Sequence, residues 1–164
     1  AAENIDADII VNVQGDEPFT QTDTLKKLLD VFERDYLKEI DLASPMVRLH
    51  GKDNIDNPNH VKVIADQNNF AIYFSRSPIP YPRNQEIDIP YYKHIGIYAF
   101  RKAALLAFKS TPMTPLENAE KIECIRYLET GKKIKMVEID HVGISIDSPE
   151  DLEKAKDYMN TRNN

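Results

Sequence analysis

The chain has 164 residues, of which 41% are hydrophobic and 29% charged, and its formal net charge is −6. This length allows one domain with a hydrophobic core, and the composition is ordinary for a globular protein. The acidic balance argues against sequence-independent binding of nucleic acid, which needs a basic face. No apolar run approaches the roughly 18 residues of a membrane span, and no signal peptide is recognisable. The single cysteine, Cys124, excludes an internal disulfide and suits a cytoplasmic protein.

A short apolar run at residues 9–13 is rich in β-branched side chains and predicts a buried strand in a parallel sheet. The sequence QGDEP follows and ends the strand, which places Gln14 and Asp16 on a tight loop. Ligands bind at the C-terminal ends of strands in open α/β sheets. An acid such as Asp16 at this edge suits Mg²⁺, which prefers oxygen ligands. The alternative is a polar turn without a ligand.

Periodicity and turn residues predict the other elements. A helix is expected after the QGDEP loop, with Leu25, Leu28, Leu29 and Phe32 on one apolar face. Further helices are expected at residues 101–109, at 114–131 and from Ser148 onwards. Further strands are expected at residues 42–49, 61–64, 70–74, 93–100, 134–139 and 142–146, with a hairpin turn at 66–69.

Prolines set apart two segments. Pro45 predicts that the strand at residues 42–49 is irregular or lies at a sheet edge. Residues 77–90 contain four prolines and predict an extended, exposed excursion. The strand expected at 93–100 alternates His94, Gly96 and Tyr98 against Ile95, Ile97 and Ala99, so one of its faces is expected to pack against the core.

A glutamate stripe runs along the helix expected at residues 114–131. At 100° per residue, one side carries Glu117, Glu120, Glu123, Cys124 and Tyr127. Like charges at this spacing cost a few tenths of a kcal/mol per pair. Two interpretations remain open: a solvated face, or a site for a polyol whose hydroxyls donate to the carboxylates. Cys124 is interpreted as a small buried residue, because no Cys/His pair accompanies it.

Four other residues are candidates for a functional role, and each also has a purely structural interpretation. Asp147 resembles Asp16 in following a strand, and two converging carboxylates would hold Mg²⁺, although Asp147 also suits a helix N-terminus. His94 faces a ligand site or is a satisfied structural histidine. Arg76 binds a ligand or forms a surface ion pair, and Lys62 meets phosphate or is a solvated strand lysine.

Six ordered blocks give these residues a context. They are VNVQGDEPF, NPNHVKVI, IYFSRSPIPYPR, YYKHIGIYAFRK, TPLENAEKIECIRYLE and GISIDSPEDL. Together they resemble the successive blocks of the CMP-Kdo synthetase (3-deoxy-manno-octulosonate cytidylyltransferase) family, over nearly the whole chain. The resemblance implies a Rossmann-like α/β nucleotidyltransferase sheet with a dimerisation arm, here within residues 70–100 of a single domain covering 1–164, and therefore a homodimer.

The resemblance also implies the activity. Members of the family join CTP and Kdo to give CMP-Kdo and pyrophosphate, with Mg²⁺, for lipopolysaccharide biosynthesis. Its metal ligands correspond to Asp16 and Asp147, which are also the implied catalytic residues. The implied sugar-binding residues are Gln14, Arg76, His94, Tyr98 and Glu123.

Two departures from the family pattern matter. The family has a glutamine where this chain has Cys124, which leaves open a cytidylyltransferase for another acidic sugar, such as an amino-substituted Kdo. The family also begins with a strand and a basic, glycine-containing nucleotide loop ahead of QGDEP. The sequence is therefore expected to be the C-terminal two-thirds of such an enzyme, inactive by itself. A non-catalytic sugar-binding or dimerisation module is a further alternative.

Overall fold

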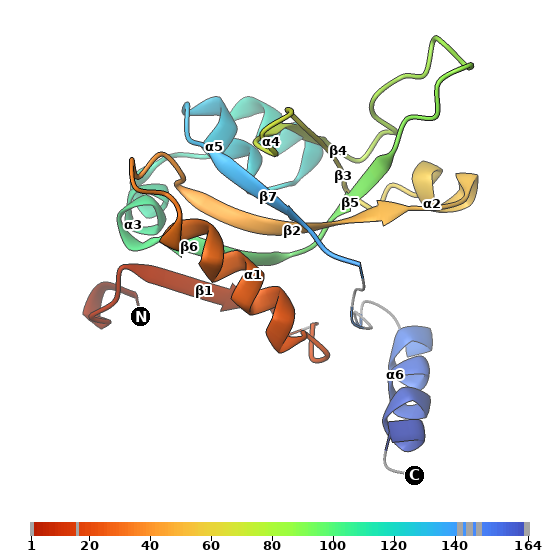
Figure 1. The fold of residues 1–164 in the computed structure, drawn as a ribbon, viewed down its shortest axis with the longest axis horizontal. Helices are drawn as coiled ribbons and strands as arrows, with labels where there is room; N and C mark the ends of the chain where they lie inside the picture. The colour runs from red at the N-terminus through yellow and green to blue at the C-terminus, as the bar shows by residue number, and fades with distance from the viewer. Residues whose placement is uncertain (1, 16, 141–142, 144–145, 147–148, 163–164) are drawn as a thin grey trace.

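The structure is a computed structural model that describes residues 2–15, 17–140, 143, 146 and 149–162. A seven-stranded sheet forms the centre of the fold (Figure 1). Its strands are β1 (Ile9–Val13), β2 (Leu42–Leu49), β3 (Lys62–Ala65), β4 (Ala71–Ser75), β5 (Tyr91–His94), β6 (Ile97–Arg101) and β7 (Ile134–Glu138). The helices are the 3-10 turn η1 (Ala2–Asn4), α1 (Thr22–Glu33), α2 (Lys52–Asp56), α3 (Lys102–Ser110), α4 (Pro115–Glu120), α5 (Ile125–Glu129) and α6 (Pro149–Arg162).

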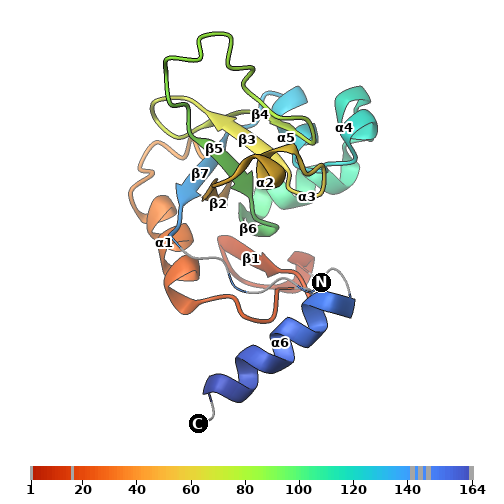
Figure 2. The same cartoon turned by 90° about the vertical axis from the view of Figure 1, so that its right-hand side faces the viewer.

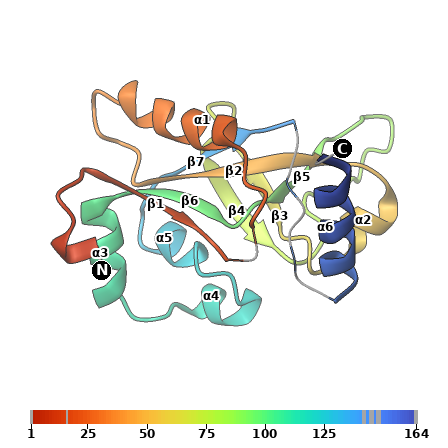
Figure 3. The same ribbon diagram turned by 90° about the horizontal axis from the view of Figure 1, so that it is seen from below.

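The sheet separates two helical layers. Figure 3 shows α1 on one face and α3, α4 and α5 on the other. Each face has its own apolar core. Leu28 of α1 packs with Ile95, Ile97 and Ala99 on the first face, whereas Tyr98 and Phe100 pack with residues of α3 and α5 on the second. Neighbouring side chains thus enter different cores, as the alternation predicts, but the single strand expected at residues 93–100 is wrong, because the chain forms two strands, β5 and β6, separated by Ile95 and Gly96.

The expectation of a parallel sheet is wrong for most of the described strands. The order is β1-β6-β2-β5-β3-β4, and β7 pairs with β2. The β2–β7 pairing is parallel, and the other strand pairings within the described residues are antiparallel. Strand β1 pairs there with β6 alone and lies at the end of the sheet. Its first three residues are half-buried and its last two are exposed, so it is not the buried strand that the apolar run predicts.

Strand β2 lies inside the sheet, which corrects the expectation that Pro45 marks an edge. Ala43 pairs with Ala99 of β6, and Met46 pairs with His94 of β5. Three residue steps along β2 thus face five steps along the partner, so the partner chain bulges between β5 and β6. Pro45 lies opposite this bulge, and its carbonyl accepts a hydrogen bond from the Ile95 amide at 3.0 Å. The proline is tolerated because the ladder is already interrupted there.

The helix expected at residues 114–131 is two short helices. Its predicted start is confirmed: Pro115 opens α4, and the Thr114 amide donates to Glu117 Oε2 at 3.1 Å. The backbone then turns at Lys121, whose φ of 54° lies in the left-handed region, and α5 begins at Ile125. A non-glycine residue in this conformation is uncommon, so the lysine at this position does not predict the break. The glutamate stripe along one continuous helix is consequently wrong.

Two segments leave the main body. Residues 77–90 form the predicted excursion, which extends away from the sheet between β4 and β5 (Figures 1 and 2). Helix α6 lies at the opposite end, beside the loop that follows β1, where the rings of Phe19 and Tyr158 meet edge to face at 5.2 Å. The strand expected at 142–146 falls mainly outside the described residues. No helix of the described part of the chain is long and apolar enough to cross a membrane.

Candidate functional site

A polar cavity of about 200 Å³ opens where β1 ends, beside the bulge between β5 and β6. All five residues that the sequence predicts for sugar binding line it: Gln14, Arg76, His94, Tyr98 and Glu123. They come from four separate parts of the chain, so the fold has brought them together. The predicted metal ligands Asp16 and Asp147 lie outside the described residues.

Gln14 and Gly96 form one wall of this cavity. The side chain of Gln14 lies about 3.5 Å from the position that a Cβ atom on Gly96 would occupy. Gly96 lies within the bulge between β5 and β6, and its missing side chain leaves space for the amide of Gln14. The sequence predicts that Gly96 permits the close approach of a ligand, and the structure shows a protein side chain in that place.

His94 forms the base of the cavity and is 7% exposed. Its Nε2 atom is 2.8 Å from Ser44 Oγ, and its ring meets Phe74 and Tyr98 with centroid distances of 4.9 Å and 5.5 Å. Burial, together with the positive charge of Lys93, lowers the pKa of His94 to about 3. The imidazole is therefore neutral near pH 7, which suits hydrogen bonding to a hydroxyl group and rules out a role as a permanent cation.

Tyr98 and Cys124 mark the boundary with a second, apolar cavity of about 420 Å³. Gln14, Tyr98 and Glu123 line both cavities, whereas Cys124 lines the apolar one. Burial, with Cys124 and Glu123 nearby, raises the pKa of Tyr98 well above its usual value. Burial also raises the pKa of the Cys124 thiol, so the thiol stays protonated and is no nucleophile.

Arg76 is held by backbone carbonyls, which corrects the expectation of a surface ion pair. Its guanidinium donates to the carbonyls of Glu120 at 2.7 Å, Pro58 at 3.0 Å and Lys121 at 3.4 Å. The carboxylate of Glu120 accepts from the Arg76 amide and from Ser75 Oγ. The three carbonyl bonds use three of the five N–H groups of the guanidinium, so two are left without a partner among the described residues and can bind a ligand.

The three glutamates of the predicted stripe have three different environments. Glu117 is 2% exposed and forms an ion pair with Arg126. Glu120 binds the end of β4, as described above. Glu123 is exposed and lines the polar cavity. Neither a solvated stripe nor a shared polyol site describes this arrangement, because the break after α4 turns the side chains apart.

The cavity also contains residues that the sequence did not single out, namely Glu17, Asn59, Lys93 and Lys121. Each lies within one of the six blocks that resemble the family, and this was the sequence feature that could have identified them as site residues. Lys62 is completely buried and does not line the cavity. Its ammonium group donates to the carbonyls of Asn57, at 2.9 Å, and Arg76, so it is neither the solvated lysine nor the phosphate ligand considered from the sequence. Burial lowers its pKa, with Arg76 contributing.

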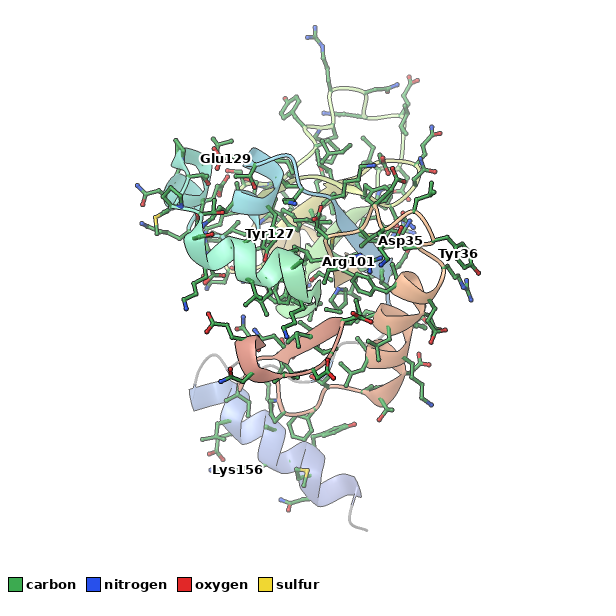
Figure 4. The ribbon with its side chains drawn as sticks, turned by 90° about the vertical axis from the view of Figure 1, so that its left-hand side faces the viewer. Asp35, Tyr36, Arg101, Tyr127, Glu129 and Lys156 are labelled. Atoms are coloured by element: carbon green, nitrogen blue, oxygen red, sulfur yellow. The ribbon has the colours of Figure 1, made fainter. Side chains whose placement is uncertain are left out.

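Outside the cavity, Arg101 and Asp35 pair at 2.6 Å beside the end of α1, where Figure 4 shows Tyr36 pointing outward next to them. Among the described residues, no group of three or more His, Cys, Asp or Glu side chains is placed to hold a metal ion. Around the polar cavity itself, the groups that can take part in binding are the neutral imidazole of His94, the guanidinium of Arg76, the amide of Gln14 and the carboxylate of Glu123.

Comparisons with known proteins agree with the resemblance seen in the sequence. The 3-deoxy-manno-octulosonate cytidylyltransferase of Flavobacterium johnsoniae is 60% identical over 156 residues, which cover 95% of this chain and 64% of the relative. The 8-amino-3,8-dideoxy-manno-octulosonate cytidylyltransferase of Shewanella baltica (strain OS185) is 39% identical over 94% of this chain and 62% of its own length. The chain thus spans a little under two thirds of these curated relatives.

Solved structures extend the comparison to the fold. A CMP:2-keto-3-deoxy-manno-octonic acid synthetase complexed with CTP has a TM-score of 0.91 and 35% identity, over 98% of this chain and 65% of that one. A 4-diphosphocytidyl-2C-methyl-D-erythritol synthase from Anaerococcus prevotii, at 14% identity and a TM-score of 0.57, shares the fold alone. A family model described as Cytidylyltransferase matches residues 1–134. The chain therefore belongs to the cytidylyltransferase family.

Proposed function

We propose that this chain provides the acidic-sugar site of an enzyme that joins CTP and Kdo to CMP-Kdo and pyrophosphate. The observation that carries the proposal is the convergence of Gln14, Arg76, His94, Tyr98 and Glu123 on one polar cavity. The relatives named for this reaction support it.

The charges around the cavity suit a sugar acid. Arg76, Lys93 and Lys121 are cationic, and Arg76 retains two N–H groups that can bind a carboxylate in the paired geometry that guanidinium favours. Glu123 and Gln14 are hydrogen-bond acceptors for sugar hydroxyls. The cations would hold the carboxylate of Kdo while the acceptors orient its hydroxyls.

The reaction is a nucleotidyl transfer. The anomeric hydroxyl oxygen of Kdo forms a bond to the α-phosphorus of CTP, the bond from that phosphorus to the β-phosphate oxygen breaks, and pyrophosphate leaves with its electron pair. The hydroxyl proton passes to a base or to solvent. Orientation of the attacking hydroxyl by the cavity accelerates such a step by positioning.

Asp16 and Asp147 are the residues that would hold Mg²⁺. Two carboxylates are the oxygen donors that this ion prefers, and bound Mg²⁺ supplies neutralisation of phosphate charge. The segments that carry the two acids meet at described residues: Phe19, three residues after Asp16, and Gly143, four residues before Asp147, are so close that a Cβ on Gly143 would lie 2.6 Å from the Phe19 carbonyl oxygen.

The setting of the enzyme is also a proposal. An exposed excursion at residues 77–90, with Tyr81 85% and Ile87 57% exposed, suits a dimerisation arm of a homodimer. A product that carries activated Kdo suits lipopolysaccharide biosynthesis in the cytoplasm.

A second candidate substrate is 8-amino-Kdo, for which the Shewanella relatives are named. Glu123 favours this candidate, because an exposed carboxylate in the cavity can pair with an ammonium group. Cys124 gives it less support than the sequence suggested, since the residue lines the neighbouring cavity.

Calorimetric titration of the 164-residue chain with Kdo and with 8-amino-Kdo tests the proposal. We expect saturable binding of Kdo that is weakened about tenfold by Glu123→Gln, as for the loss of one charged hydrogen bond. Lys109→Ala serves as the control, because Lys109 is exposed and does not line the cavity. Equal and unsaturable heats for wild type and Glu123→Gln would overturn the assignment of the cavity. Tighter binding of the amino sugar, lost in Glu123→Gln, would select the second candidate.

A further inference from the structure

Ser44 occupies an unusual polar position inside β2. It is completely buried between apolar neighbours, and its hydroxyl lies 2.8 Å from His94 Nε2, 2.8 Å from the Ile97 carbonyl and 3.0 Å from the Ile95 carbonyl. The two carbonyls belong to the bulge between β5 and β6, which turns both of them toward the same oxygen atom. Three polar groups thus surround one hydroxyl group.

Counting protons around this hydroxyl assigns the tautomer of His94. A serine hydroxyl has one proton, whereas both carbonyls can only accept. If Nε2 were also an acceptor, three acceptors would compete for that proton, and at least one carbonyl would face an oxygen lone pair at about 3 Å. If Nε2 carries a proton, it donates to Ser44 Oγ, and the single serine proton goes to the Ile97 carbonyl, since the Ile95 carbonyl already accepts from the Ile97 amide at 2.8 Å. Only in the second case do the Nε2–Oγ contact and the contact with the Ile97 carbonyl each contain a proton, so this case satisfies the buried network.

The other ring nitrogen of His94 has no such partner. Among the described residues, none forms a hydrogen bond with Nδ1. Nδ1 is also not among the completely buried side-chain atoms that lack a partner, so it is partly exposed. The histidine lines the polar cavity and keeps a small exposed fraction. In a neutral imidazole protonated at Nε2, Nδ1 is an acceptor.

We propose that Ser44 is a positioning residue that holds His94 as the Nε2–H tautomer, so that Nδ1 accepts a hydrogen bond from a hydroxyl group of the bound sugar acid. The sugar part of this inference rests on the proposed function, whereas the tautomer does not. Gln14 and Glu123 are acceptors that also line the cavity, and an additional acceptor at its base gives a polyhydroxylated ligand a further hydrogen bond.

A matched pair of variants separates the hydroxyl from its surroundings. Ser44→Thr keeps the hydroxyl, and Ser44→Val has the same shape as threonine without it, so both carry the same packing change. Nitrogen-15 NMR of the histidine ring distinguishes the tautomers. We expect the Nε2–H form in wild type and in Ser44→Thr, and a substantial Nδ1–H population in Ser44→Val, where an Nε2–H group would lack its acceptor.

Titration with Kdo completes the test. We expect Ser44→Val to bind Kdo about tenfold more weakly than Ser44→Thr, as for one lost hydrogen bond. Nδ1–H as the main form in the unmodified chain would overturn the inference, even if neither variant folded. An unchanged tautomer in Ser44→Val would overturn it as well. If the Nε2–H form is found but the wild-type chain does not bind Kdo, the tautomer assignment stands and the sugar assignment falls together with the proposed function.

Discussion

Glu117 and Arg126 form a buried, bidentate ion pair that spans the break between α4 and α5. Arg126 Nε donates to Glu117 Oε2 at 2.6 Å, and Arg126 Nη2 donates to Glu117 Oε1. The side chains are 3% and 14% exposed, and the guanidinium carbon lies 4.0 Å from the centroid of the Phe108 ring. The pair fixes how the two short helices meet, and therefore where Glu123, between them, faces the cavity.

Arg126→Met is expected to destabilise the chain by about 3–5 kcal/mol, because it leaves the carboxylate of Glu117 buried without its partner. Urea unfolding at pH 7 measures the loss. Lys109→Met is the matched control, since it removes the exposed pair with Glu3 and should cost at most about 1 kcal/mol. Equal, small losses in both variants would mean that the buried pair contributes no more than a surface pair.

The same pair predicts a dependence on pH. The hydrogen bonds from Arg126 hold the pKa of Glu117 below its usual value, against the opposing effect of burial. Its contribution to stability is therefore complete above the unfolded pKa of about 4.3 and is lost as pH falls through the lower folded value. The unfolding free energy of Arg126→Met should accordingly fall less steeply than that of wild type below pH 4.3. Parallel curves would contradict this expectation.

His94 predicts a second dependence on pH, in a different range. Its pKa is lowered to about 3 in the folded chain, so above about pH 6.5 both the folded and the unfolded states are neutral and stability is complete. Between pH 6.5 and 3 the unfolded state binds a proton that the folded state excludes, so stability decreases as pH falls. His94→Gln cannot take up this proton. Between pH 7 and pH 5, wild type should lose about 2 kcal/mol more than His94→Gln; an equal loss would show that His94 is protonated in the folded state.

Sequence patterns located most of the elements, since the apolar runs, the hairpin turn and the Thr114-Pro115 start are local signals. Local sequence patterns do not indicate which strands pair with one another or in which direction. A strand of residues 9–13 looks the same beside a parallel or an antiparallel neighbour, so the parallel sheet was wrongly expected. Lys121 ended α4 without any sequence signal, because a lysine seldom adopts a positive φ.

Some residues of the candidate site could likewise be predicted from the sequence, and others could not. Gln14, Arg76 and His94 were predicted from blocks that resemble a known family, and the structure brings them to one cavity. Ser44 was not predicted, because a small residue in an apolar strand carries no signal of its own. Its position depends on a two-residue bulge in another strand, which is a property of the register between distant segments.

Close backbone contact between Gly143 and Phe19 predicts a difference between two glycines. A Cβ on Gly143 would lie 2.6 Å from the Phe19 carbonyl oxygen, whereas a Cβ on Gly15 would meet no atom of the described residues within 4 Å. Gly143→Ala should therefore cost about 1–3 kcal/mol, because backbone must move, and Gly15→Ala should stay within about 0.5 kcal/mol of wild type. Thermal unfolding of the two variants side by side measures the difference. A Gly143→Ala variant as stable as Gly15→Ala would show that these segments separate at little cost.

Arg76 predicts a coupled loss of stability and binding. Its guanidinium joins the carbonyl of Pro58 to those of Glu120 and Lys121, at the rim of the polar cavity. A lysine has one nitrogen and cannot reproduce this geometry. Arg76→Lys should therefore destabilise the chain by about 1–2 kcal/mol through lost hydrogen bonds.

The same substitution should weaken Kdo binding by tenfold or more, because the rim loosens and a paired contact to the sugar carboxylate is lost. Arg83→Lys, in the exposed excursion, is the control of equal chemistry and should change neither quantity. Urea unfolding and calorimetry on the same preparations separate the two effects. Stability lost with affinity unchanged would make Arg76 a structural clamp that does not contact the ligand. If affinity is lost while stability is unchanged, the important hydrogen bonds of Arg76 are those to the ligand in the bound complex. If neither affinity nor stability changes, Arg76 is not part of the site.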